Sequence, residues 1–206
     1  MKYMYETIEI IMKRRSIRRF SSLQVSDEAV ETLLQCALYA PSGHNRQLSR
    51  FIVLQGDIAL GELNGIIQQE LAGSDPALGS PMYAGAQRAR GERYQFCYQA
   101  PTLITAVAPR DYPNAMADCA CALENVMLAA TALGLGSCWS NQAHWLTDVP
   151  AIRAFFARYG LREGEDIFGS VAIGYGEGPY PTVVPRKDGR IEWNKTEFRS
   201  KEKDNG

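Results

Sequence analysis

The feature that most constrains how this chain can fold is a stretch near its middle that is apolar on almost every side of a helix. Residues 118–133 predict this helix, and its apolar and small members include Ala120, Cys121, Leu123, Val126, Met127, Leu128, Ala129 and Ala130. A helix that is hydrophobic all round avoids water, so we expect it to be buried in the core or at a subunit interface. Gly134 follows it and should end it.

Shorter patterns on both sides of this helix predict a mixed fold. Apolar residues at helical spacing predict helices over residues 7–13, 57–71 and 147–159, and another that begins after the cap Ser26 and ends at Pro41. Apolar runs predict strands over residues 51–54, 103–108 and 168–175. Because helices and strands do not alternate strictly, the pattern favours the α+β class over a doubly wound sheet.

The chain has the length and composition of one domain. Its 206 residues are 46% hydrophobic and 22% charged, as is usual for a globular protein. We assign residues 1–199 to a single domain and expect residues 200–206 to be a disordered tail. Residues 72–95 break the pattern with glycine and proline, around a possible helical turn at 84–90, and loops of this length are usually functional or disordered.

The sequence predicts a cytoplasmic location. No apolar run approaches the roughly 20 residues that span a bilayer, and residues 1–6 lack the apolar stretch of a signal peptide, so we expect no membrane. An odd count of five cysteines without framework spacing predicts reduced thiols. The two histidines lie far apart in the sequence, so we expect no metal site.

A cluster of basic residues near the N-terminus predicts a site for a small anion. Five cations surround Ser16, and they are Lys13, Arg14, Arg15, Arg18 and Arg19. The whole chain has 22 basic and 23 acidic residues, so it lacks the basic character of a nucleic-acid-binding domain. A phosphate would be held well by forked arginine donors and a hydroxyl. The alternative is a solvated helix end, where cations favour the helix dipole.

Two further segments have the composition of ligand-binding turns. Residues 40–47 follow a predicted helix and contain Pro41, Ser42, Gly43, His44, Asn45 and Gln47, whose small side chains and amides suit a flat polar ligand, although an ordinary turn has the same composition. Residues 133–141 contain a G-x-G. A dinucleotide-binding fingerprint needs a strand before it, whereas a helix is predicted here, so we reject a Rossmann fold and expect a close-packed turn. Pro185, Arg186 and Lys187 form a basic motif that by itself indicates only surface.

Taken in order, these segments resemble the nitroreductase family of flavin enzymes over nearly the whole chain. The matching parts are residues 14–20 for the N-terminal flavin motif, 40–47 for the P-S-x-x-N-x-Q loop, Ala100, Pro101, Asp118, Asn125 and residues 134–139 for the middle, 171–175 for a late strand and 185–187 for the closing basic motif. Each motif is weak alone, and the ordered set is specific. One departure is Leu48 after Gln47, where family members often have Pro-Trp, so the substrate pocket is expected to differ.

The resemblance implies a nitroreductase-like α+β fold, with a mostly antiparallel central sheet flanked by helices, in an intertwined homodimer that binds FMN at the subunit interface. The residues it implies for the phosphate and the polar ring edge are Arg14, Arg15, Ser16, Arg18, Arg186 and Lys187. The residues it implies near the ring are Trp139, Ser140 and Asn141, with Pro41, Ser42, Gly43, Asn45 and Gln47 from the partner subunit. A backbone N–H near flavin N5 would stabilise the reduced flavin.

The resemblance also implies the reaction. NADH or NADPH would reduce FMN at N5, and a small, flat, electron-poor molecule such as a nitroaromatic or a quinone would then be reduced in a ping-pong cycle. No catalytic side chain is assigned, and His44 is a weak candidate for proton donation. Losing Arg15 and Arg18 together should abolish FMN binding.

Two other interpretations remain at the level of sequence. One is an FMN enzyme of the same fold with a dehydrogenase, dehalogenase or flavin-cleaving reaction, since a fold does not settle function. The other, more remote, is a non-enzymatic protein that binds nucleotides or nucleic acid through the basic cluster. The net charge of −1 and the apolar helix at 118–133 argue against the second.

Overall fold

A four-stranded antiparallel sheet forms the centre of the protein. The structure, a computed structural model, describes residues 2–194. The strands are β1 (Arg50–Gln55), β2 (Thr102–Pro109), β3 (Gly136–Ser140) and β4 (Glu165–Gly174), in the spatial order β1-β2-β4-β3. Every neighbouring pair is antiparallel, which confirms the predicted α+β class and the antiparallel sheet.

The two central strands are buried on both faces. β2 is buried along almost all of its length, and β4 is buried throughout its second half. Their polar members are paired, since the hydroxyls of Thr105 and Ser170 share a hydrogen bond of 2.9 Å across the β2–β4 register. Buried hydroxyls that bond each other avoid the cost of an unsatisfied polar group, so the sheet interior is uninterrupted.

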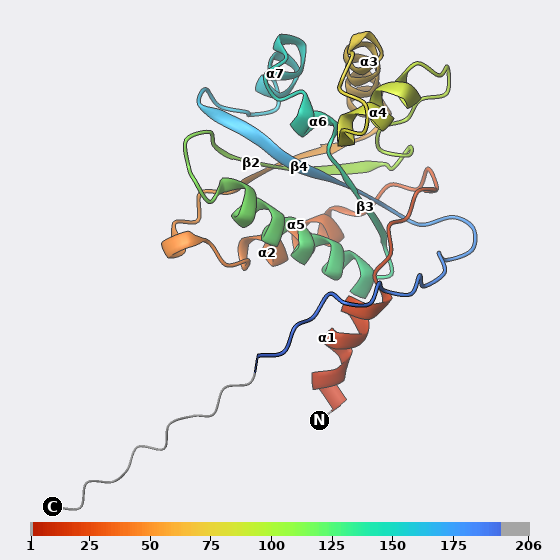
Figure 1. The fold of residues 1–206 in the computed structure, drawn as a ribbon, viewed down its shortest axis with the longest axis vertical. Coiled ribbons are helices and arrows are strands. Elements are labelled where there is room, and N and C mark those ends of the chain that lie inside the picture. The colour runs from red at the N-terminus through yellow and green to blue at the C-terminus, as the bar shows by residue number, and fades with distance from the viewer. Residues whose placement is uncertain (1, 195–206) are drawn as a thin grey trace, which may run out of the picture.

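Helices cover both faces of the sheet (Figure 1). One face carries α2 (Asp27–Leu38) and α5 (Ala115–Ala132). The other carries α3 (Asp57–Gly73), α4 (Pro81–Ala89), α6 (Gln142–Trp145) and α7 (Pro150–Ala157). The first helix, α1 (Lys2–Lys13), projects from the end of α5, and the chain after β4 runs back past it. Each face therefore has its own apolar core.

The helix α5 is the apolar helix predicted from the sequence, and only one side of it is covered by its own chain. Its buried side packs on β4 and α2, and the Asn125 amide donates to the Cys36 carbonyl at 3.0 Å. Met116 and Leu133 remain 42% and 46% exposed, and Cys121 is exposed as well. Among residues 2–194, α5 is the one helix whose length and mean hydropathy would suit a membrane span, and here it is the core helix.

Several sequence predictions need correction. Residues 136–140 form strand β3 at the edge of the sheet, whereas we expected a turn, because a run of five residues with glycine and serine carries little strand signal. The segment 72–95 is not one loop, since α4 occupies residues 81–89 with Ser80 as its cap. The helix expected at 147–159 is shorter, and α6 precedes it. The expected tail at 200–206 lies outside the described residues.

Candidate functional site

The basic cluster at the end of α1 divides into two parts. The Arg14 Nε lies 3.5 Å from a Glu124 carboxylate oxygen on α5. Arg15 donates hydrogen bonds to the carbonyl oxygens of Met12 and Arg14, at 2.8 and 2.6 Å. These carbonyls belong to the last turn of α1, where a cation complements the helix dipole. Arg14 and Arg15 therefore hold the end of a helix in this chain, as in the alternative considered above.

Ser16 and Arg18, by contrast, line cavities. A cavity of about 420 Å³ lies between Ser16, Gly136 and the segment that follows β4. A second cavity, of about 750 Å³, lies beside it on the α4 side of the molecule, and Arg18 and Arg19 line both. The guanidinium of Arg18 sits 5.8 Å from the centre of the Tyr98 ring, and the Tyr98 hydroxyl raises the pKa of Arg18 above its ordinary value.

Backbone contacts with β3 place Ser16 at the smaller cavity. The Ile17 N–H donates to the Ser137 carbonyl at 2.9 Å, which adds this segment to the edge of the sheet. The contact is close, since a Cβ on Gly136 would lie 2.9 Å from the Ile17 side chain. The hydroxyl of Ser137 is buried and has no hydrogen-bond partner among the described residues. Ser137 lines neither of the two cavities, so this hydroxyl belongs to the interior behind them.

The three residues expected beside the flavin ring follow at the end of β3. Trp139 packs over Gly169 of β4, where no side chain would fit, and its indole N–H donates to the Asn141 side chain. The Ser140 hydroxyl donates to the Gln142 side-chain oxygen at 2.7 Å. Gln142 itself lines the larger cavity.

The segment 41–47 is held in a strained shape by the start of α5. His44, Asn45 and Gln47 have φ angles of 53°, 53° and 52°, in the left-handed region that side chains rarely adopt. The Gly43 N–H donates to both oxygens of the buried Asp118 carboxylate, at 3.1 and 3.2 Å. Fixed contacts of this kind are what keep a strained backbone in place. Pro41, Ser42 and Gln47 line a small cavity here, and the His44 side chain is exposed.

Tyr112 also bonds to the Asp118 carboxylate, and we call these contacts of Asp118 with Gly43 and Tyr112 the clamp on Gly43. The Tyr112 hydroxyl donates to the carboxylate at 2.9 Å. Burial and the neighbouring Asp118 raise the pKa of Tyr112 above its ordinary value. A Cβ on Gly43 would overlap the Asn114 amide and lie 2.8 Å from the Tyr112 hydroxyl. A side chain at position 43 would therefore displace the ends of the Asn114 and Tyr112 side chains.

Within one chain the structure does not bring the 41–47 loop to the basic cluster. The loop is fixed to Asp118 near the start of α5, and the smaller cavity is lined by Thr131 near its end. These two residues are thirteen positions apart, which at about 1.5 Å per residue is roughly 20 Å along the helix. Figure 1 shows the two segments at opposite ends of α5.

The C-terminal basic motif also lies away from the cavities. Arg186 and Lys187 are exposed in an extended segment. The smaller cavity is lined by the earlier part of this segment, from Gly176 to Pro181, and the Tyr180 hydroxyl donates to the Lys13 carbonyl at 3.0 Å. The contact orients the segment past α1 without bringing Arg186 to Ser16.

Tyr94, Tyr98 and Gln142 line the larger cavity, and the sequence analysis did not identify them. Tyr94 is 7% exposed, and its hydroxyl is buried without a hydrogen-bond partner among the described residues. Burial raises the pKa of Tyr94 to about 12, against the opposing effects of Gln142 and Arg88. The one available signal was the long segment before β2, which was expected to be functional, but no spacing in it singles out Tyr94.

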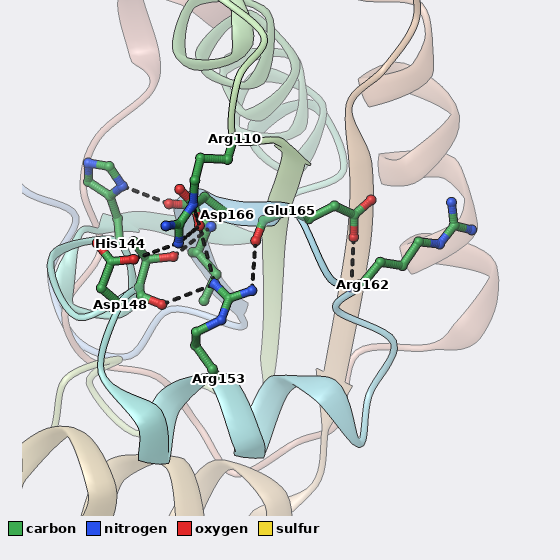
Figure 2. A network of polar contacts seen from close by, with 9 residues as sticks. Arg110, His144, Asp148, Arg153, Arg162, Glu165 and Asp166 are labelled. Carbon is green, nitrogen blue, oxygen red and sulfur yellow. Dashed lines mark hydrogen bonds and ion pairs between the residues drawn. The ribbon is translucent and has the colours of Figure 1, made fainter.

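A network of ion pairs fixes the elements around Gln142 (Figure 2). At the start of β4 the Asp166 carboxylate accepts from Arg110 at 2.7 Å and from Arg153 at 3.2 Å. The His144 Nδ1 lies 2.7 Å from the Ile167 carbonyl oxygen and so ties α6 to β4. The charges in this network are paired with one another, which indicates a structural role. It determines where α6, and with it Gln142, sits.

Comparison with known proteins identifies the family. Residues 11–175 match the sequence model of the Nitroreductase family. The chain therefore belongs to the nitroreductase family, as its motifs predicted.

Individual relatives agree with this assignment. An Archaeoglobus fulgidus protein, named as a candidate NADH dehydrogenase/NAD(P)H nitroreductase, is 30% identical over 84% of this chain and 86% of its own length. A nitroreductase with bound FMN from Bacteroides fragilis superposes with a TM-score of 0.84, at 34% identity, over 92% of this chain and 99% of that one. Another, from Desulfitobacterium hafniense and also with bound FMN, has a TM-score of 0.79 at 29% identity, over 92% and 98%.

Proposed function

We propose that this protein is an FMN-dependent oxidoreductase that uses NADH or NADPH to reduce small, flat, electron-poor molecules such as nitroaromatics and quinones. The observation that carries the proposal is the pair of adjoining cavities that share Arg18, one beside Ser16 and the other beside Gln142. A flavin nucleotide has a phosphate and a flat polar ring, and two adjoining cavities that share arginines suit that shape. The FMN-bound nitroreductases of the same fold support the choice of ligand.

The residues around Ser16 fit the phosphate end of FMN. Ser16 and Arg18 offer a hydroxyl and a forked cation at the smaller cavity. Charge-assisted hydrogen bonds of this kind contribute about 1.5–3 kcal/mol each when shielded from water. Arg14 and Arg15 lie next to this cavity and would add positive charge, and Arg186 and Lys187 would have to move to reach it.

The proposal requires two copies of the chain. If Pro41, Ser42, Gly43, Asn45 and Gln47 contact the flavin, they cannot do so in their own subunit, because they are fixed at the other end of α5. A homodimer built on the exposed side of α5 would bring the loop of one subunit to the basic cluster of the other. Such an interface would suit the exposed apolar residues Met116 on α5, Leu133 directly after it, and Ile8, Ile11 and Met12 on α1.

FMN, when bound, would supply the hydride chemistry, and the chain would bind and orient the reactants. Ser140 and Asn141 end β3 where the ring is expected, and a backbone N–H there would point at the reactive edge. The paired networks beneath α6 and the contacts of Gly43 with Asp118 would hold the two sides of the proposed site in place. One open face of the ring would serve reductant and acceptor in turn, which is the ping-pong order.

The test is to purify the protein and identify any chromophore that it releases. We expect a yellow protein that releases one FMN per chain, elutes as a dimer and is bleached under anaerobic conditions by NADH or NADPH. Steady-state rates with a quinone acceptor should then give parallel lines in double-reciprocal plots. A colourless protein that takes up no added FMN would overturn the proposal. A yellow protein that neither nucleotide reduces would point to another reaction on the same fold.

A further inference from the structure

We propose that the α4 side of the larger cavity is a binding site for an anionic group of the second ligand, so that the protein acts on acidic aromatic acceptors or holds the phosphates of its nicotinamide donor. The inference rests on the proposed function, because it assumes that the flavin occupies the neighbouring space beside Ser16 and Arg18. Both kinds of ligand combine a flat ring with an anionic oxygen, which is a carboxylate on the acceptor and a phosphate on the nicotinamide donor.

The charge of the cavity supports this ligand. Its lining includes the four arginines Arg18, Arg19, Arg88 and Arg93 against the two acids Glu92 and Glu177. Among the residues described, the guanidinium groups of Arg88 and Arg93 form no ion pair or hydrogen bond with another side chain or carbonyl. Two arginines without counter-charges at the mouth of one cavity favour an anion.

The position of Arg88 follows from the packing of α4. Gly85 lies against the Trp145 ring of α6, since a Cβ there would be 3.0 Å from the indole. Arg88 is three residues further on and so shares this side of the helix. The Arg88 side chain is exposed and lines the same cavity as Gln142 of α6, and its charge acts on the Tyr94 hydroxyl.

The same wall presents buried groups with unused hydrogen-bonding capacity. The Tyr94 hydroxyl is buried without a hydrogen-bond partner of normal length among the described residues, and the neighbouring Gln142 side chain opposes the rise in the pKa of Tyr94. Both residues are 7% exposed and line the cavity. A buried hydroxyl and amide beside two cations form a receptor for oxygen acceptors.

Side chains of α3 hold this wall in place. The Asn64 amide donates to the Tyr94 carbonyl at 3.1 Å and its oxygen accepts from the Phe96 N–H at 3.0 Å. The Gln68 amide donates to the carbonyls of Ala89 and Gly91 at 3.2 and 3.0 Å. These bonds brace the backbone on both sides of Arg88 and Tyr94, while the Arg88 and Arg93 side chains themselves are exposed.

The test compares the double variant Arg88→Gln, Arg93→Gln with the control Arg90→Gln. Arg90 has the same charge and lies two residues from Arg88, but it donates to the carbonyls of Ala72 and Ser74 and does not line the cavity. The acceptors are 4-nitrobenzoate and its neutral analogue 4-nitrobenzamide. Flavin reduction by NADH and by NADPH is measured separately under anaerobic conditions, and benzoate and benzamide binding to the oxidised holoenzyme is measured by calorimetry.

If the acceptor carries the anion, the double variant should lose about tenfold or more in kcat/KM for 4-nitrobenzoate and in benzoate affinity, with less than a twofold change for the amides. If the site instead binds a phosphate of the reductant, the double variant should slow flavin reduction by NADH or NADPH about tenfold or more, with little change for the benzoates. Arg90→Gln should change neither. Equal effects on charged and neutral ligands with unchanged flavin reduction, or an equal loss in Arg90→Gln, would overturn the inference while the flavin spectrum remained. If the purified protein bound no flavin, the proposed function would be wrong, and this inference would be wrong with it.

Discussion

The two ends of α5 differ in how completely the chain satisfies its own polar groups. At the start of the helix the Asp118 carboxylate is buried and accepts three hydrogen bonds, from the Gly43 N–H twice and from Tyr112. Near its end, Arg18 lines two cavities, and the Ser137 hydroxyl nearby has no partner among the described residues. At the start of α5 the polar groups are paired within the chain. Near its end, the Arg18 guanidinium lines cavities in which a ligand could bind.

This difference suggests that stability and binding can be separated by mutation. Substitutions at the Asp118 end should change the free energy of unfolding first and ligand affinity only through the loop that the clamp holds. Substitutions at the Arg18 end should change affinity while the fold persists. The following predictions test this contrast, in order of decreasing expected effect.

Replacing Asp118 with alanine should have the largest effect. It leaves the half-buried Gly43 N–H and the Tyr112 hydroxyl without their acceptor, and we expect the free energy of unfolding to fall by about 2–3 kcal/mol. Urea denaturation measures this change. Asp111→Asn, at an exposed position in the turn before α5, is the control and should be neutral. An Asp118→Ala protein as stable as the parent would show that the clamp does not matter for the fold.

Arg18→Ala and Arg15→Ala should separate the two parts of the basic cluster. Arg18 lines both cavities but is exposed, so its loss should weaken FMN binding about tenfold, near the lower limit for a charge-assisted bond. Arg15 is occupied by carbonyls of α1, so its loss should change FMN affinity less than threefold. Flavin fluorescence titration of the apoprotein measures both. The reverse order would mean that Arg15 turns toward the ligand when it binds.

Tyr94→Phe should change how stability depends on pH. The pKa of Tyr94 is raised from 10.0 to about 12, so the unfolded chain releases this proton at lower pH than the folded protein does. The stability gained from burying the neutral phenol is therefore complete below pH 10 and is lost as pH rises to about 12. Urea midpoints over this range should fall less in Tyr94→Phe than in the parent. Parallel curves would show that the Tyr94 hydroxyl is not buried in solution.

His44→Gly should have the smallest effect. The φ of 53° at His44 strains the folded protein by about 1 kcal/mol, and glycine would remove this strain. Glycine also makes the unfolded chain more flexible, which offsets part of the stabilisation. We expect a gain in stability of about 0.5 kcal/mol, measured by thermal unfolding. The same variant tests whether His44 donates a proton, because turnover with a quinone should then fall while FMN affinity stays the same. A loss of stability would mean that the imidazole makes contacts that a single chain does not show, as the proposed dimer would allow.

The sequence by itself determined the elements whose signals are local. The apolar pattern at 118–133, the Ser26 cap and the strand runs at 103–108 and 168–175 all gave elements in the expected places, because periodicity and capping depend on residues a few positions apart. The ordered motifs also predicted the family. Strand β3 was missed because its pairing with β4 comes from a distant part of the chain.

Only the tertiary structure decided how the candidate site is composed. The sequence does not distinguish Arg14, Arg15 and Arg18. In the structure, Arg14 pairs with Glu124 and Arg15 bonds to carbonyls at the end of α1, whereas Arg18 lines the cavities. Tyr94 and Gln142 are 48 positions apart and meet because Asn64 and the ion pairs at β4 hold their backbones. The separation of the 41–47 loop from the basic cluster depends on the length of α5. Contacts between distant residues depend on how whole elements pack, and a local sequence pattern carries no record of that packing.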